Sequence, residues 1–213
     1  MNILYIDTVT EWMVTGVFSI QNGGVLVRTL LKERVPREGG VRLPLRVEEH
    51  KKTAGIKKPD RILTLHGPGS FTGIRIGLAF SKTYSQVLDI PVMGLNSIEV
   101  YSMYYYNKYR ERVLVLLDGR MKKVYGGGYS ENGFEGVLDL PPEILKGKLH
   151  AGNAKLFSDY PEENSVDMST DFPDPLPYLE KNIEQILKLN IEEYNWKNLN
   201  PLYMRGTYVD GKK

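Results

Sequence analysis

The stretch His66–Gly77, HGPGSFTGIRIG, decides the fold prediction. It follows the apolar run Arg61–Leu65, and a helical pattern continues from it to about Leu88. A buried strand that ends in a Gly/Pro turn, with Ser70 or Thr72 as a cap, predicts a strand–turn–helix unit. Such a turn points backbone N–H groups and the positive end of a helix dipole outward, which suits an anion. The spacing matches neither G-x-x-x-x-G-K-[ST] nor G-x-G-x-x-G, so a purely structural tight turn is the other interpretation.

The helix after this turn carries small residues at intervals of four. They form one stripe along the helix: Gly73, Gly77, Ser81 and Ser85. Each interior glycine costs roughly 1 kcal/mol relative to alanine, and close packing of another backbone usually offsets that cost. The stripe therefore packs either against this protein's own sheet or against a partner helix.

Outward from this unit, the first half of the chain alternates strands and helices. Strands are predicted at Asn2–Ile6, Trp12–Ile20, Val25–Leu31 and Ile90–Leu95, and helices at Leu43–Ala54, with Pro44 in its first turn, and at Ser97–Tyr106. The resulting order, β-β-β-α-β-α-β-α, predicts a mixed sheet flanked by helices, an α/β fold.

The second half gives a weaker pattern. Strands are predicted at Arg112–Leu117 and Lys122–Tyr129, followed by a polar, proline-punctuated stretch that reads mostly as loop. The late helix Tyr178–Leu189 has Leu179, Ile183, Ile186 and Leu187 on one face. We expect two lobes, residues 1–108 and 109–213, with the last segment a candidate to return to the first lobe.

Composition excludes several classes of protein. The chain has 213 residues, a net charge of +2 and no cysteine, so a disulfide scaffold, a thiol nucleophile and a cysteine-bound metal are excluded. No apolar run approaches the roughly 20 residues of a membrane span, and the N-terminus has no basic segment typical of a signal peptide. We expect a cytoplasmic protein.

Asp7-Thr8, at the end of the first predicted strand, is a second candidate site. Actin-like nucleotide-binding proteins hold a metal–phosphate group with a carboxylate in this position, usually followed by a glycine. Here Val9 and Thr10 follow, so a role in capping the turn is the alternative. The three histidines, His50, His66 and His150, do not show the spacing of metal ligands.

Five motifs occur in an order that resembles the TsaB (YeaZ) family, glycoprotease-like proteins of bacterial tRNA modification. They are ILYIDT (Ile3–Thr8), HGPGSFTGIRIG (His66–Gly77), PVMGLNS (Pro91–Ser97), LLDGRMKKVY (Leu116–Tyr125) and PLYMR (Pro201–Arg205). The resemblance covers residues 1–130 well and 131–200 poorly, and it returns at the end.

The resemblance implies an actin-like (ASKHA, ribonuclease H-like) fold of two small lobes with mixed sheets flanked by helices. It implies a non-catalytic subunit for N6-threonylcarbamoyladenosine at position 37 of tRNAs that read ANN codons. The catalytic paralogue, TsaD, carries the metal, the nucleotide and the transfer chemistry. The ATPase TsaE joins the assembly, and TsaC supplies threonylcarbamoyl-adenylate. The paralogue's H-x-x-x-H metal pair is absent here. The resemblance also implies no cofactor of this chain's own, although a nucleotide at a partner interface stays open.

In this family the helices after the first sheet form a helix-bundle interface with the paralogue or with a second copy. The interface residues implied here are the stripe Gly73, Gly77, Ser81 and Ser85, together with Arg75. Isolated protein is then a homodimer. A vestigial phosphate site is implied at Asp7, Thr8, Gly67, Gly69 and Ser70. No residue is assigned to catalysis or to a metal. The chain departs from the family where Gly39-Gly40, rather than histidine, follows Pro36-Arg37-Glu38.

Two other functions stay open. One is an ASKHA-type ATPase or kinase that uses Asp7 and the Gly67–Gly73 turn; the other is a peptidase, which lacks both a metal site and a catalytic triad. We expect the isolated chain to bind tRNA weakly, because its net charge is only +2. The cluster Lys51, Lys52, Lys57, Lys58 and Arg61 is a candidate to contact tRNA within a complex.

Overall fold

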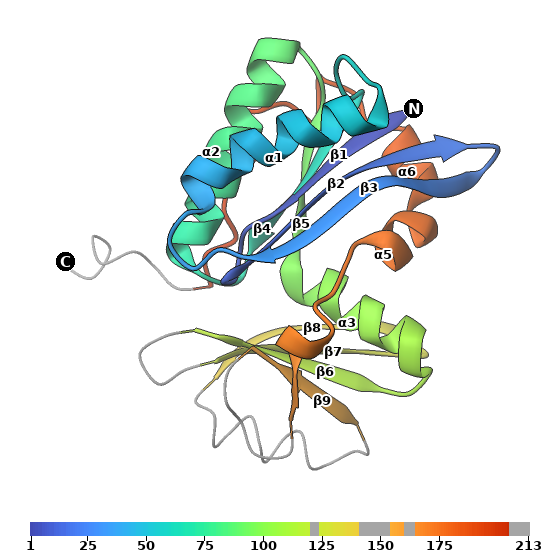
Figure 1. Cartoon of the computed structure of the whole chain (residues 1–213). Helices are drawn as coiled ribbons and strands as arrows, with labels where there is room; N and C mark the ends of the chain where they lie inside the picture. Colours follow the sequence, from blue (N-terminus) through green and yellow to red (C-terminus); the bar gives the residue numbers. More distant parts are fainter. Residues whose placement is uncertain (120–123, 141–153, 160–164, 205–213) are drawn as a thin grey trace.

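The computed structural model describes residues 1–119, 124–140, 154–159 and 165–204. Two lobes are visible in Figure 1, and each is built on a five-stranded sheet. The first sheet has the order β3-β2-β1-β4-β5. Its strands are β1 (Asn2–Asp7), β2 (Trp12–Gln21), β3 (Gly24–Arg34), β4 (Arg61–Gly67) and β5 (Val92–Asn96). Strands β1 to β3 pair antiparallel, whereas β4 and β5 run parallel to β1.

The second sheet repeats this topology. Its order is β10-β9-β6-β7-β8. Its strands are β6 (Val113–Asp118), β7 (Val124–Ser130), β8 (Gly133–Leu140), β9 (Lys155–Ser158) and β10 (Val166–Asp167). The first strand again lies in the centre, with two antiparallel strands on one side and two parallel strands on the other. The two lobes are therefore two versions of one unit.

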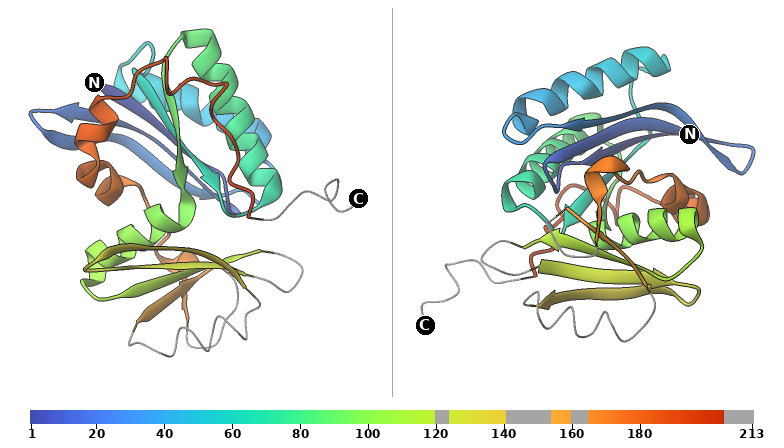
Figure 2. Two further views of the ribbon diagram at one scale, coloured as in Figure 1. Left: turned by 180° about the vertical axis from the view of Figure 1, so that it is seen from behind. Right: turned by 60° about the horizontal axis from the view of Figure 1, so that its bottom comes forward.

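Helices form layers on the sheets (Figure 2). Helices α1 (Gly39–Ala54) and α2 (Phe71–Leu88) pack together on one face of the first sheet, α1 over β2 and β3 and α2 mainly over β4. Helix α3 (Ser97–Tyr109) lies between the lobes and covers the second sheet, and the short helices α5 (Leu176–Lys181) and α6 (Ile183–Leu187) follow later in the chain. Among the described residues, no helix has the length and apolar character to cross a membrane.

Alternation along β1 divides its side chains between two layers. Ile6 and Thr8 contact the position of Gly77 on α2. Asp7 points to the opposite side, where it meets Tyr101 of α3. Because successive side chains of a strand face opposite sides of the sheet, neighbouring residues at the end of β1 serve two different helices.

Helix α1 begins four residues earlier than the sequence predicts. It starts at Gly39 rather than Leu43, and Pro44 lies inside it rather than in its first turn. Cβ atoms added at the two glycines of its first turn would lie 3.8 and 4.0 Å from the Cδ1 atom of Ile76 on α2, which is an ordinary contact distance. The first turn therefore lies beside α2, and the packing of the whole helix against its neighbours outweighs the poor helix propensity of glycine.

The late helix is two helices. The prediction of one helix over Tyr178–Leu189 is wrong, because α5 ends at Lys181 and α6 begins at Ile183. Between them, the side chain of Asn182 donates a hydrogen bond to the carbonyl of Tyr178 at 2.8 Å. Asparagine competes in this way with backbone hydrogen bonds inside helices. Leu187, expected on the buried face, is 46% exposed.

Three strands lie where the sequence predicts loop. Strands β8, β9 and β10 fall between residues 133 and 167, and the last has only two residues. β9 and β10, with four and two residues, are too short to leave a clear periodic signal, and Gly133 and Gly136 interrupt the pattern of β8. Helix α3 also extends past the predicted Tyr106 to Tyr109.

The chain returns from the second lobe to the first after residue 171. Phe172 stacks on Trp12 of β2 with ring centroids 5.5 Å apart. Lys32 of β3 donates to the carbonyl of Phe172 at 2.6 Å and pairs with Asp174 at 3.0 Å. Arg61 of β4 donates to the carbonyl of Ile186 at 2.8 Å. The division at residue 108 stays a prediction, and the 176–204 segment packs on the first lobe.

Candidate functional site

The Gly/Pro turn joins β4 to α2 as the sequence predicts. Ser70 caps the helix, and its Oγ atom accepts a hydrogen bond from the backbone N–H of Gly73 at 3.3 Å. Gly67 has a φ of 115°, which favours glycine, and a Cβ there would lie 2.9 Å from the carbonyl oxygen of Leu202. The turn is therefore held between the helix it starts and the end of the described chain.

The loop after β1 lies directly on this turn. Ser70 donates its backbone N–H to the carbonyl of Val9 at 2.6 Å, and the hydroxyl of Thr8 donates to the carbonyl of Gly73 at 2.7 Å. A Cβ at Gly69 would collide with the Val9 carbonyl, and one at Gly73 would collide with the Thr8 carbonyl. The structure thus brings the five predicted phosphate-site residues to one place, and it fills the space against the turn with the chain's own backbone.

Asp7 is fully buried beside this loop. Its Oδ2 atom accepts a hydrogen bond from the Tyr101 hydroxyl at 2.6 Å, and its Oδ1 atom accepts one from the backbone N–H of Val9 at 3.1 Å. Burial raises the pKa of Asp7 from 3.8 to about 7, although these two hydrogen bonds lower it. Both oxygens of this carboxyl group are therefore engaged by the protein itself.

The stripe of small residues on α2 faces the first sheet of its own chain. A Cβ at Gly77 would lie 2.5 Å from the Thr8 hydroxyl oxygen. Ser81 and Ser85 are fully buried, and the Ser85 hydroxyl donates to the carbonyl of Ile90 at 2.6 Å. The prediction that this stripe meets a partner is therefore wrong, because the loop after β1 and the strands under α2 occupy that side of the helix.

Arg75 lies on the exposed side of α2. Its guanidinium stacks over the ring of Phe71 at 3.9 Å, and its Nε atom lies 3.4 Å from the Tyr203 hydroxyl. Leu202 donates its N–H to the carbonyl of His66 at 2.8 Å. The PLYMR motif therefore packs against the HGPGSFTGIRIG motif. Residue 205 of the first motif and residues 120–123 of the LLDGRMKKVY motif lie outside the described residues.

The two described histidines, His50 and His66, have separate partners. His66 contacts the carbonyl of Asn200 through Nδ1 at 3.0 Å, and burial lowers its pKa. His50 lies between the hydroxyl groups of Thr15 and Thr29, at 3.0 and 2.7 Å. His150 is outside the described residues. Within the described ranges, no group of three or more His, Asp or Glu side chains could hold a metal ion.

The outer side of α1 and α2 carries a surface that the sequence analysis did not single out. Phe80 and Tyr84 stack there with ring centroids 5.2 Å apart. We call this surface the α1–α2 outer face; its apolar residues are Val41 (73% exposed), Leu45 (60% exposed), Val87 (74% exposed) and the half-buried Phe80 and Tyr84. One sequence signal could have revealed this surface. Val41 and Leu45 are four residues apart, on the side of α1 away from its buried apolar residues.

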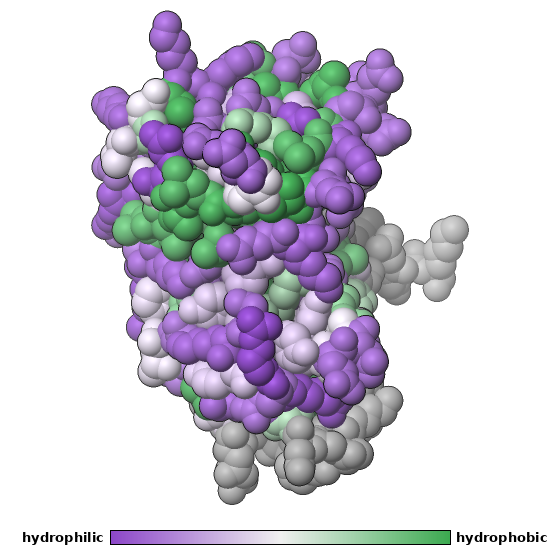
Figure 3. Space-filling model, turned by 90° about the vertical axis from the view of Figure 1, so that its right-hand side faces the viewer, coloured by the Kyte–Doolittle hydropathy of each residue, from purple (hydrophilic) through white to green (hydrophobic). Residues whose placement is uncertain are grey.

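A hydrophobic area also lies on the side of the β2–β3 hairpin, which Figure 3 views directly. Leu26 (49% exposed) and Val27 (39% exposed) on β3 are the exposed apolar side chains of this hairpin. β3 is an edge strand. Edge strands and apolar helix faces are both candidates for contact with other chains.

Two lobes of one topology, with mixed sheets flanked by helices, define an actin-like, ribonuclease H-like protein. The solved structure of YeaZ from Pseudomonas aeruginosa has this fold: the TM-score is 0.74 at 24% identity, covering 95% of this chain and 99% of that one. Residues 33–177 match the family model described as TsaD, tRNA N6-adenosine threonylcarbamoyltransferase.

The curated relatives indicate which branch of this family the chain resembles. The tRNA threonylcarbamoyladenosine biosynthesis protein TsaB of Escherichia coli is 31% identical over 158 residues, which are 70% of this chain and 66% of that protein. TsaB of Bacillus subtilis is 35% identical over 69 residues, 32% of this chain and 30% of that protein. The matches thus span less than two thirds of these relatives' lengths. The chain belongs to the TsaB (YeaZ) branch of the threonylcarbamoyltransferase family.

Proposed function

We propose that this chain is a non-catalytic subunit in the biosynthesis of N6-threonylcarbamoyladenosine at position 37 of tRNA, and that it binds and supports the catalytic paralogue TsaD. The names of the curated relatives support the pathway. The observation that carries the non-catalytic role is the turn between β4 and α2. The backbone of Thr8 and Val9 lies against it, where an actin-like enzyme would need room for phosphate.

The chemistry of Asp7 supports the same proposal. A carboxylate that holds a metal–phosphate group must be ionised and within reach of the ligand. Asp7 is instead buried, with both oxygens hydrogen-bonded and its pKa raised to about 7. We therefore assign no cofactor to this chain.

The α1–α2 outer face is the surface that we assign to TsaD. Large apolar side chains on two adjacent helices resemble the core of a protein interface rather than an ordinary surface. The described residues of the chain leave Val41, Leu45 and Val87 exposed. In the absence of TsaD, we propose that a second copy binds the same face and forms a homodimer. TsaE and tRNA then join through the complex.

A direct test is copurification of this chain with the TsaD of the same organism. We expect Leu45→Glu to weaken binding about thirtyfold or more, because a charge in the centre of an apolar interface costs at least about 2 kcal/mol. The matched control is Leu26→Glu, which places the same charge on the exposed edge strand β3. Binding is measured by calorimetry, and modification of tRNA by the reconstituted complex is measured in parallel.

Loss of binding with Leu26→Glu but not with Leu45→Glu would move the interface to β3. An ATPase activity of the pure chain that disappears in Asp7→Ala would support the ATPase or kinase function instead.

A further inference from the structure

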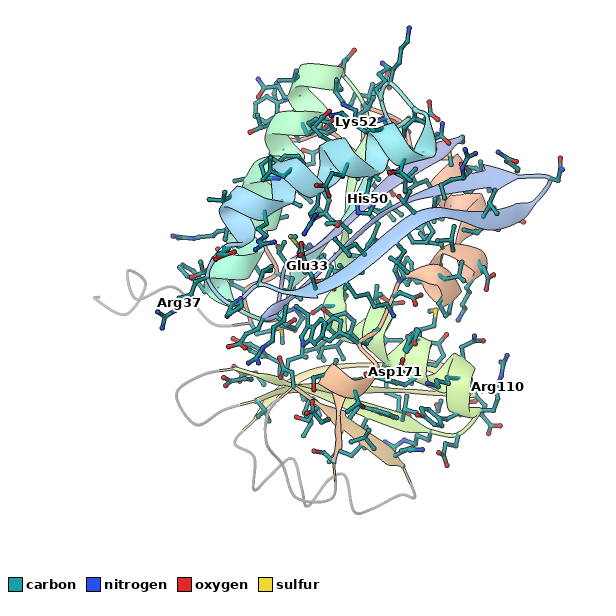
Figure 4. The ribbon with its side chains drawn as sticks, in the orientation of Figure 1. Glu33, Arg37, His50, Lys52, Arg110 and Asp171 are labelled. Carbon is teal, nitrogen blue, oxygen red and sulfur yellow. The ribbon has the colours of Figure 1, made fainter. Side chains whose placement is uncertain are left out.

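A group of cations gathers where α1 ends. We call it the basic corner; its members are Arg28, Lys52, Lys57 and Lys58. Gly55, with a φ of 67°, reverses the chain after the helix, and its N–H bonds to the carbonyl of Lys52 at 3.1 Å. Arg28 of β3 joins from another element, because its Nη2 atom donates to the carbonyl of Ala54 at 3.1 Å. Lys52 lies at the end of the first lobe that is far from the second lobe (Figure 4).

The charges of the basic corner are not compensated. Within the described part of the chain, none of its four members forms an ion pair. The carboxylates of α1 nearby are already engaged, because Glu48 pairs with Lys51 at 2.8 Å and Glu49 pairs with Arg46 at 2.7 Å. The nearby Asp60 accepts a hydrogen bond from the backbone N–H of Asn2 at 2.6 Å. Four cations without an ion pair thus gather on a protein whose net charge is only +2.

The fold explains only part of this cluster. Cations near the C-terminus of a helix are stabilised by its dipole, and this accounts for Arg28 and Lys52. Lys57 and Lys58 lie beyond the helix end, are exposed, and add repulsion without a structural partner. Exposed, unpaired lysines grouped in this way are the electrostatic footprint of a polyanion.

The basic corner borders the α1–α2 outer face. Leu45 and Lys52 lie on the same helix, seven residues or about 10 Å apart along its axis. Lys51, next to Lys52, extends over the ring of Tyr84 on α2 at 5.8 Å from the centroid. A partner bound to the outer face would therefore lie beside this corner.

Resting on the proposed function, we propose that the basic corner contacts the phosphate backbone of tRNA while TsaD holds that tRNA for modification. Lysines in such a position strengthen binding without reading sequence, because phosphates are the same at every nucleotide. The contact positions the RNA, and the isolated chain binds it weakly.

The test uses the complex of this chain with TsaD and TsaE, and a transcript of an ANN-reading tRNA as the probe. The variant is Lys57→Glu/Lys58→Glu. The control, Arg37→Glu/Arg110→Glu, makes the same change in charge at exposed positions far from the corner (Figure 4). Filter binding is measured over a series of KCl concentrations, after gel filtration has shown that each complex assembles.

We expect the corner variant to weaken tRNA binding about tenfold and to reduce the slope of log K against log salt by about 1 to 2. The KM for tRNA in the modification assay should rise while kcat is kept. The control should bind within about twofold of wild type.

Unchanged binding by the corner variant would overturn the proposal, as would an equal loss in both variants. Failure of the corner variant to bind TsaD or TsaE without RNA would show that the corner binds an acidic protein surface instead. If wild-type chain does not bind TsaD at all, the proposed function itself fails, and that result is seen before any RNA is added.

Discussion

The two sides of α2 differ in what they contain and what they contact. The inner side carries Gly73, Gly77 and Ser81, which lie against the loop after β1 and the first sheet. The outer side carries Phe80, Tyr84 and Val87, which no other described element covers fully. Small residues on this helix therefore serve the fold, whereas the large apolar residues of the outer side stay partly or fully exposed, and we propose that they contact a partner.

The glycines of α2 have a local physical purpose. Two glycines inside a helix cost roughly 1 kcal/mol each relative to alanine. Here they let the Thr8 backbone approach the helix closely enough for the Thr8 hydroxyl to bond the Gly73 carbonyl at 2.7 Å. Substitutions on the two sides should consequently change different properties. Those on the inner side should change stability, and those on the outer side should change association.

The largest effect is expected from Gly73→Val. Its Cβ would collide with the carbonyl oxygen of Thr8, a backbone atom that cannot move away like a flexible side chain. We expect the free energy of unfolding to fall by more than about 4 kcal/mol, so that the protein is largely insoluble or unfolded at 25 °C. Urea unfolding followed by circular dichroism measures this, with Thr72→Val, on the exposed side of the same turn, as the control. A loss below 1 kcal/mol would show that the loop after β1 is free to leave the turn.

Much of the first lobe could be predicted from the sequence, because its signals are local. The strand–turn–helix at His66–Gly77 follows from an apolar run, a Gly/Pro turn and a cap, all within neighbouring residues. The start of α1 could not be predicted in this way, because its first turn lies beside Ile76 of another helix, which local composition does not show. Strand β8 depends on pairing with β7, β9 on pairing with β6, and β10 on pairing with β9, and local composition does not encode these pairings.

The candidate site shows the same limit. The sequence indicated which residues of α2 are unusual, but spacing alone does not say which side of a helix meets its own sheet. Thr8, on a loop 65 residues away from Gly73, decides the answer. The outer face could be found only once the inner face was placed.

The next largest effect is the contribution of Asp7 to the pH dependence of stability. Burial raises its pKa from 3.8 to about 7, so the folded protein favours the neutral carboxyl group. Its contribution to the free energy of unfolding is fully present below about pH 4 and is lost as the pH rises through 7. The change amounts to at most about 4 kcal/mol. Asp7→Asn keeps groups that can bond Val9 and Tyr101, so it should lose this dependence.

The measurement is urea unfolding of both proteins at pH 4.5, 6 and 8. The difference between them isolates Asp7 from the other titrating groups. We expect the free energy of unfolding of the asparagine variant to rise relative to that of wild type as the pH rises. At pH 8 the variant should be at least as stable as wild type. Parallel curves for the two proteins would show that Asp7 stays ionised, as a ligand for a cation would.

The smallest expected change in stability comes from a comparison of Ser81→Leu with Ala79→Leu. This pair tests the two sides of α2 most directly. Ser81 is fully buried, and its hydroxyl has no hydrogen-bond partner among the described residues, so the substitution acts through volume. Overpacking of this kind costs about 1–3 kcal/mol. Ala79 is exposed on the other side of the helix, where leucine should change stability by less than about 0.5 kcal/mol.

Binding to TsaD should be affected in the reverse order, more by Ala79→Leu than by Ser81→Leu. At a temperature where both variants are folded, Ser81→Leu should bind TsaD like wild type, whereas Ala79→Leu adds a side chain next to the α1–α2 outer face and should change the affinity. Thermal unfolding and calorimetric binding on the same samples give both quantities. If Ser81→Leu instead kept wild-type stability and lost association, the small residues would face the partner after all. The difference between the two sides of α2 would then have the opposite meaning.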